Sequence, residues 1–308
     1  MSSASTATVG SSQQVTVGAG LKLAATLTLP RATGLHPAIV PLHPAGNRSR
    51  DQYLFRHLAE ILPPQGIAVL RYERRGDDVA FEDQVADALS AVEMLAARSD
   101  VDPNRIGLWG FSQGAWIAPM LAAESDRIAF LVLLGSSGVS PAEQMRYGTV
   151  KHARQAGYDE DVVRRIVDLR RLLEDYARGR IPREVAQRSI DAVAPESWFE
   201  QAYVRRTLPE APAFWPELDF DPKAVFSRVR VPTLLLYGED DEWQPIDASI
   251  ESWRLAAATA GNDDLTIVRL AGTGHAPTLG GREERDAIAP DYERTLLAWL
   301  GLRVGGAR

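Results

Sequence analysis

The 308-residue chain contains no cysteine. That absence excludes disulfides, thiolate metal sites and cysteine nucleophiles, so any covalent catalysis must use another side chain. Long apolar runs are missing too, since the longest, at 115–123 and 130–134, fall well short of the roughly 18 residues that a membrane helix needs. We therefore expect no membrane-spanning segment.

A basic surface and a targeting segment are also lacking. With a net charge of -7 the chain offers no basic face that could neutralise phosphates, so we expect no nucleic-acid partner and no membrane partner. Residues 1–13 are mostly small and polar, without a basic start or an apolar centre. We interpret them as a flexible tail rather than a signal peptide and expect a cytoplasmic protein.

The residues that are present describe a globular chain, with 45% hydrophobic and 24% charged side chains. Short apolar segments typical of buried strands alternate with amphipathic segments typical of helices. The predicted strands are 21–29, which alternates, and 38–43, 67–72, 105–109, 129–134, 233–237 and 265–270; the predicted helices are 51–62, 82–98, the segment after Ser112, 247–258 and 288–300. This order predicts an α/β fold with a mostly parallel central sheet covered by helices on both faces. In helix 82–98, Asp83 and Asp87 are expected to face outward.

The alternation stops in the middle of the chain. Residues 140–228 are predicted to form a helical cap insertion, and residues 14–139 and 229–302 the α/β core. The insertion contains large aromatic side chains, of which Trp198, Phe214 and Trp215 are candidates to contact a substrate. The alternative is that they pack the insertion and touch no substrate.

The pattern Gly110-x-Ser112-x-Gly114 follows an apolar strand and precedes an apolar helix. Two flanking positions without a Cβ permit a sharp strand-to-helix turn that exposes the serine hydroxyl. The N–H group of Gln113 and the helix dipole could then stabilise an oxyanion. The alternative is an ordinary turn without chemistry.

A serine nucleophile needs a base, and the base needs an orienting carboxylate. Of the five histidines only His43 and His275 follow apolar strands. His275 is the stronger candidate, because two glycines free its loop; otherwise it is a surface histidine. For the acid, the strand at 233–237 is followed by four acidic residues, of which Asp241 is the first choice and Glu242 and Asp240 are the alternatives.

From about Val15 to Leu300 these features resemble the α/β-hydrolase fold superfamily, whose order of nucleophile, acid and histidine matches Ser112, Asp241 and His275. The Asp-Pro-Asn-Arg segment at 102–105 is similar to the dienelactone-hydrolase-like and prolyl-peptidase-like branches. The loop at 43–46 departs from the usual His-Gly of the family and reads His-Pro-Ala-Gly.

In that loop the resemblance assigns the second oxyanion donor to Ala45, since proline has no N–H. His43 then either braces the loop or contacts substrate.

The resemblance implies a serine hydrolase with a cap, which cleaves a carboxylic ester through an acyl-enzyme and needs neither a metal nor another cofactor. The expected partner is a small-molecule acyl substrate, and a homo-oligomer stays open. Three alternatives remain: thioesterase or peptidase activity, lyase or cyclase chemistry on the same triad, and a catalytically silent binding module.

Overall fold

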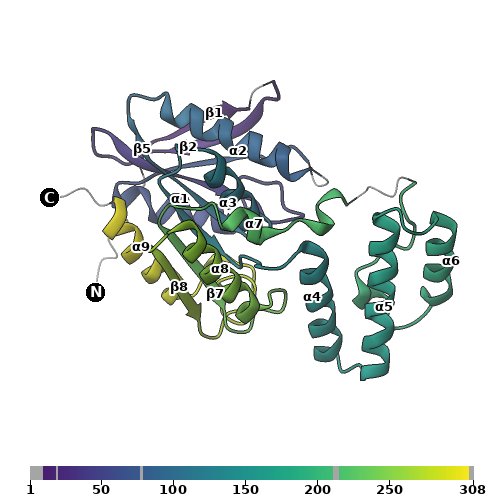
Figure 1. Cartoon of the computed structure of the whole chain (residues 1–308). Helices are drawn as coiled ribbons and strands as arrows, with labels where there is room; N and C mark the ends of the chain where they lie inside the picture. The colour runs from purple at the N-terminus through teal and green to yellow at the C-terminus, as the bar shows by residue number, and fades with distance from the viewer. Residues whose placement is uncertain (1–9, 19, 77–78, 211–214, 305–308) are drawn as a thin grey trace. The chain divides into compact units, whose positions relative to one another are not determined.

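The structure is a computed structural model that describes residues 10–18, 20–76, 79–210 and 215–304 (Figure 1). The chain divides into two compact units. The sheet unit comprises the chain up to Ser136, Lys223–Asp241 and the residues from Trp253 onward. The helical unit comprises Ser137–Pro222 and Glu242–Ser252.

In the described part of the sheet unit, eight strands form one sheet in the order β1-β2-β4-β3-β5-β6-β7-β8. β1 and β2 are antiparallel, β2 pairs antiparallel with β4, and all later pairs are parallel. The strands are β1 Ser12–Val17, β2 Leu23–Thr28, β3 His36–Leu42, β4 Ala68–Tyr72, β5 Val101–Phe111, β6 Phe130–Leu134, β7 Thr233–Gly238 and β8 Leu265–Leu270. β3, β4, β6 and β7 are buried along their whole length, in agreement with their mostly apolar sequences.

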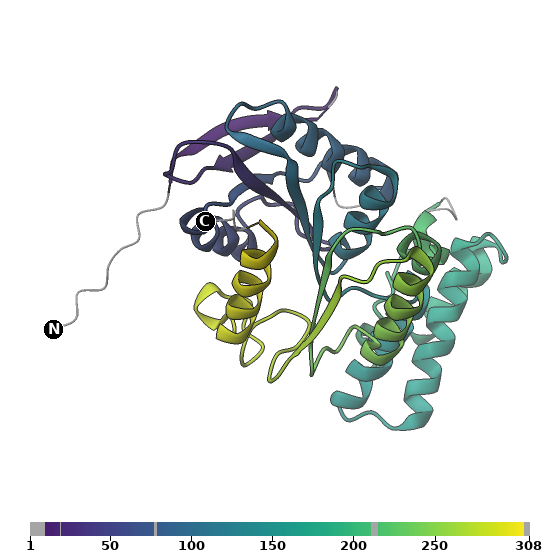
Figure 2. The ribbon, with the colours of Figure 1, turned by 60° about the vertical axis from the view of Figure 1, so that its left-hand side comes forward.

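Helices cover both faces of this sheet, as the sequence predicts. Figure 2 shows α9, in yellow, on one side and α2, in blue, on the other. α1 and α9 share a core with the strands, in which the Nε1–H of Trp109 donates to the hydroxyl of Tyr292 (3.1 Å). The helical segments of this unit are α1 Tyr53–Ile61, η1 Pro63–Gln65, α2 Phe81–Ala96, α3 Gly114–Glu124, α7 Pro222–Phe226, η4 Arg285–Ala287 and α9 Pro290–Val304. α8 Ile246–Ala260 is divided at Ser252, and its second half belongs to this unit.

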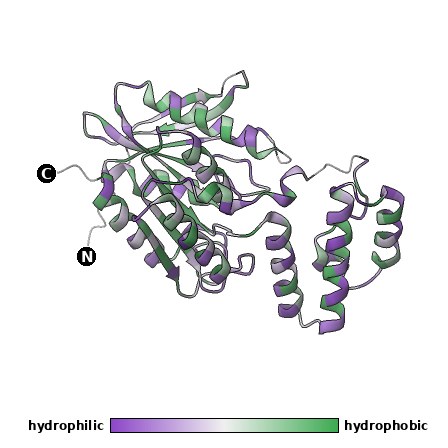
Figure 3. Ribbon diagram, viewed as in Figure 1, coloured by the Kyte–Doolittle hydropathy of each residue, from purple (hydrophilic) through white to green (hydrophobic). Residues whose placement is uncertain are grey.

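The helical unit has an apolar core of its own. It contains α4 Pro141–Gln155, α5 Glu160–Ala177, α6 Arg183–Val193, η2 Phe199–Ala202 and η3 Pro216–Asp219. Ser140 caps α4 by accepting from the N–H of Glu143 (3.3 Å), and Asp159 caps α5 by accepting from the N–H of Val162 (2.9 Å). Hydrophobic and hydrophilic residues alternate along α5 (Figure 3), which buries its apolar face in the core of this unit.

Several boundaries differ from the prediction. β1 begins at Ser12, inside the predicted tail, and the remainder of that tail lies mostly outside the described residues. β5 begins at Val101, before the predicted strand 105–109, and its register against β3 jumps from Val101 to Ile106, so residues 102–105 form a bulge. No helix of the described ranges is long and apolar enough to cross a membrane.

The outward position predicted for Asp87 is wrong. Its side chain is buried and accepts two hydrogen bonds from Arg75, at 2.7 and 2.5 Å. Asp83, in contrast, is exposed as expected and still lies 3.0 Å from Arg75. A buried carboxylate needs such a partner, and Arg75 supplies it from the segment before α2.

Candidate active site

Ser112 stands on a sharp turn between β5 and α3. Its φ of 54° lies in the left-handed region, a conformation that costs free energy for a residue with a Cβ. The N–H of Ser112 donates to the carbonyl of Leu134 (3.0 Å), which ties the turn to the end of β6.

Both glycines that flank Ser112 are required, because other backbone atoms lie too close to them for a Cβ. A Cβ on Gly110 would lie 2.4 Å from the carbonyl oxygen of Gly114, and a Cβ on Gly114 would lie 2.4 Å from that of Leu42. Neither position has room for a side chain, as the sequence pattern predicts.

Asp241 and His275 meet by a direct hydrogen bond. The Nδ1 atom of His275 lies 3.1 and 3.0 Å from the two carboxylate oxygens of Asp241. An ionised carboxylate can only accept, so Nδ1 carries the proton and donates, which leaves Nε2 as the basic nitrogen. The Asp241 side chain is fully buried, whereas Asp240 is exposed and Glu242 is half-buried.

The loops after β7 and β8 are held together by their backbones. The N–H of Asp240 donates to the carbonyl of Thr273 (3.0 Å), and the N–H of Glu239 donates to the carbonyl of Leu270 (3.0 Å). A Cβ on Gly238 would lie 2.0 Å from the carbonyl oxygen of Gly274. These contacts fix the relative positions of the two segments that carry Asp241 and His275.

Gly135, which follows β6, completes this edge of the sheet. A Cβ at this position would lie 3.1 Å from Cε1 of His275 and 3.6 Å from Oδ2 of Asp241. The ring of Phe111, the residue before Ser112, lies 5.1 Å from the imidazole. The residues that follow β5, β6, β7 and β8 therefore converge at the carboxyl edge, where parallel sheets carry their ligand sites. Sequence reasoning missed Gly135, because a lone glycine after a strand gives no sign of its neighbours.

His43, which follows β3, lies in the core of the sheet unit. It is 3% exposed and makes edge contacts with the rings of Phe55, at 4.8 Å, and Tyr72, at 5.3 Å. Burial, together with the nearby Arg74 charge, lowers the pKa of His43 to about 3. The imidazole is therefore neutral at physiological pH.

The loop that follows His43 exposes Ala45 and is held by a hydrogen bond from a buried arginine. The buried Arg74 donates from Nη1 to the carbonyl of Pro44 (3.1 Å). A Cβ on Gly114 would lie 3.1 Å from the carbonyl oxygen of His43, so this loop lies beside the start of α3. The sequence analysis did not predict this hydrogen bond from Arg74.

The predicted aromatic contacts in the insertion have different environments. Trp198 is 2% exposed in the core of the helical unit, with the Arg165 guanidinium 4.8 Å above its ring. Trp215 is half-buried, with Arg170 at 5.5 Å. Phe214 lies outside the described residues. Within the described ranges, no group of three histidine, aspartate or glutamate side chains is arranged to hold a metal ion.

Comparisons with known proteins agree with this architecture. Esterase EstD of Thermotoga maritima is 26% identical over 267 residues, which cover 80% of this chain but only 58% of EstD. The esterase Pf2001 of Pyrococcus furiosus has a similar structure (TM-score 0.64, 16% identity), with 96% of this chain and 92% of that chain covered. An acylaminoacyl peptidase of Pyrococcus horikoshii (TM-score 0.60, 14% identity) matches 98% of this chain and 43% of its own. A model of the alpha/beta hydrolase family matches residues 40–290, and the chain therefore belongs to that family.

Proposed function

We propose that the protein is a serine hydrolase that cleaves a carboxylic ester through an acyl-enzyme on Ser112. The observation that carries the proposal is the pairing of His275 with a fully buried Asp241 at the sheet edge where Ser112 occupies its left-handed turn. The likeness to proteins named as esterases favours an ester as substrate.

In the first half-reaction, the Ser112 hydroxyl oxygen attacks the ester carbonyl carbon and Nε2 of His275 accepts the hydroxyl proton. The tetrahedral intermediate then collapses, the bond to the alcohol oxygen breaks, and His275 returns the proton to that oxygen. In the second half-reaction water attacks the acyl-enzyme by the same route and releases a carboxylic acid.

Asp241 orients the imidazole and stabilises its protonated form. Because the Asp241 carboxylate is shielded from water, its attraction for the imidazolium is stronger than it would be at the surface. The oxyanion of each intermediate is proposed to accept hydrogen bonds from the N–H groups of Gln113, at the start of α3, and Ala45. The bracing of the Ala45 loop by Arg74 supports this second donor.

A panel of p-nitrophenyl esters tests the proposal. We expect hydrolysis by the wild-type protein, a loss of several orders of magnitude in Ser112→Ala, and little change in Asp240→Asn, whose carboxylate is exposed. Half-retained activity in Ser112→Ala would contradict the role of this serine.

The alternatives are separated by their products. Hydrolysis in isotopically labelled water places one labelled oxygen in the acid product, whereas lyase or cyclase chemistry does not. Thioester and peptide analogues of the best ester rank the acyl classes by kcat/KM. A protein that turns over none of these compounds would be a silent binding module.

Trp215 is the better of the two described tryptophan candidates for substrate contact, because its ring is only half-buried while Trp198 fills a core. We expect Trp215→Ala to change the ratio of kcat/KM between long and short acyl chains. Equal losses across the series would make Trp215 a packing residue.

A further inference from the structure

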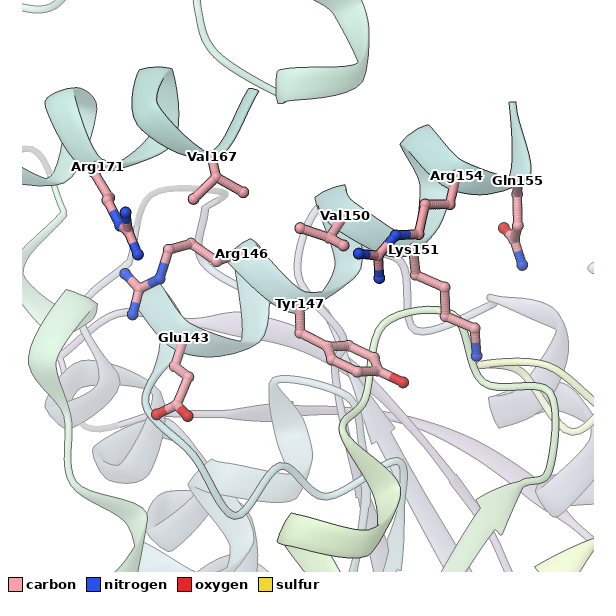
Figure 4. Close-up of a pocket in the computed structure, with 9 residues that line it drawn as sticks. All are labelled: Glu143, Arg146, Tyr147, Val150, Lys151, Arg154, Gln155, Val167 and Arg171. Atoms are coloured by element: carbon pink, nitrogen blue, oxygen red, sulfur yellow. The ribbon is translucent and has the colours of Figure 1, made fainter. Parts of the chain in front are cut away.

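A groove of about 720 Å³ lies between α4 and α5 in the helical unit (Figure 4). Its volume falls within the roughly 300–1,000 Å³ that is usual for small-molecule sites. Val150 of α4 and Val167 of α5 are half-buried and point into the space between the two helices, and Tyr147 adds an aromatic ring. Three of the nine lining residues are therefore apolar or aromatic.

The groove arises from how the two helices pack. Near the turn that joins them, Ala153 of α4 and Val163 and Ile166 of α5 are buried together in the core of the unit. At the opposite end, Arg146 of α4 bonds the buried Glu174 of α5. The half-buried surface between these two contact regions stays open to a ligand.

Four cationic side chains and one carboxylate line the groove, in a chain whose net charge is -7. The cations are Arg146, Lys151, Arg154 and Arg171, and the carboxylate is Glu143. A groove that combines apolar and cationic side chains is complementary to a ligand that combines a hydrocarbon body with an anionic head.

Two of these cations are paired only at the surface. Arg154 lies 2.8 Å from Glu160, and Arg171 lies 3.7 Å from Asp168; all four side chains are more than half exposed. A loose exposed pair such as Arg171 and Asp168 stabilises a protein little, so an anionic ligand can replace Asp168 at small cost. Arg154, in contrast, holds Glu160 by two hydrogen bonds, at 2.8 and 3.0 Å.

We propose that this groove binds a medium-chain carboxylate, with the chain against Val150 and Val167 and the head group near Arg171 and its cationic neighbours. The inference rests on the proposed function in one respect, since carboxylates are what ester hydrolysis releases. The groove would then bind the class of compound that the proposed reaction releases.

Isothermal titration of the wild-type protein with decanoate, below its micelle concentration, tests the inference. Decanol supplies the chain without the charge, and acetate supplies the charge without the chain. We expect decanoate to bind at least tenfold more tightly than either compound, because each lacks one of the two complementary features.

Substitution on α5 locates the site. Arg171→Gln should weaken decanoate binding about fivefold, and Val167→Phe, which fills the groove, should weaken it further. Arg164→Gln is the matched control, since Arg164 is equally exposed on the same helix and pairs with Asp161 at the same three-residue spacing, but does not line the groove. Circular dichroism checks that all three variants fold.

Equal binding of decanoate and decanol, equal losses in Arg171→Gln and Arg164→Gln, or unaltered binding in Val167→Phe would each overturn the inference. Binding to anionic vesicles without binding of monomeric decanoate would overturn it as well. Calorimetry does not depend on turnover, so the two proposals can fail separately. Decanoate binding can be absent while ester hydrolysis is observed, and it can be present while no ester is hydrolysed.

Discussion

Gly135→Ala perturbs the candidate triad without changing any of its three side chains. The new Cβ would lie 3.1 Å from Cε1 and 3.3 Å from Nδ1 of His275, closer than ordinary van der Waals contact. The imidazole must therefore shift by a few tenths of an ångström. Since a misplacement of about 1 Å in an active site can cost ~10²-fold in rate, we expect kcat/KM for p-nitrophenyl butyrate to fall by about tenfold.

The substitution also strains the backbone, because Gly135 has a φ of +62°. Alanine in this region costs about 1–2 kcal/mol in the free energy of unfolding. Gly261→Ala provides the matched control, since Gly261 has a φ of +67° with no atom within 4 Å of a new Cβ. Urea unfolding should show similar destabilisation in both variants, while only Gly135→Ala loses activity. Equal activity in the two variants would refute the assigned geometry.

Three further predictions concern separate features of the chain. In the same ester assay, Asp241→Asn should lower kcat by ~10⁴-fold, because the imidazole loses both its orientation and the stabilisation of its charged form. Gly148→Ala should lower the Tm, since the new Cβ would lie 2.3 Å from the Trp243 ring. Gly301 lies in α9 with open space around a new Cβ, so Gly301→Ala should raise the free energy of unfolding by up to about 1 kcal/mol, because alanine favours the helix more than glycine does. Burial holds the pKa of the folded-state His43 at about 3, so as the pH falls below about 6.5 the unfolded chain binds a proton at this histidine before the folded chain does. The free energy of unfolding should therefore fall as the pH drops from about 6.5 toward 3. Urea unfolding should show a weaker pH dependence in His43→Asn than in the wild-type protein.

Much of the fold could be predicted because its central strands are buried on both faces. Such strands are mostly apolar, so the predicted 129–134 and 233–237 correspond to β6 and β7 within one residue. Partners from other segments were not predictable from periodicity. Asp87 has the spacing of an outward residue on α2, yet its position depends on Arg75 from another segment.

The candidate site was predictable where a backbone constraint requires a particular residue type. The two glycines around Ser112 are needed because neighbouring backbone atoms lie too close for a Cβ, and the acidic run after β7 contains Asp241. The position after the strand left Glu242 and Asp240 open beside Asp241, because the hydrogen bond to His275 depends on how the loops after β7 and β8 meet. The buried position of Trp198 was equally hidden, since an aromatic residue in a helical insertion can fill a core or contact a ligand.

The most direct test of the central claim is covalent labelling of the native protein with a fluorophosphonate, followed by peptide mass spectrometry. Ser112 should carry one label per chain, the label should be absent from Ser112→Ala, and labelling should be slower by orders of magnitude in His275→Ala, because the hydroxyl then has no base. A folded wild-type protein that resists labelling, or one that carries the label on another residue, would contradict the account.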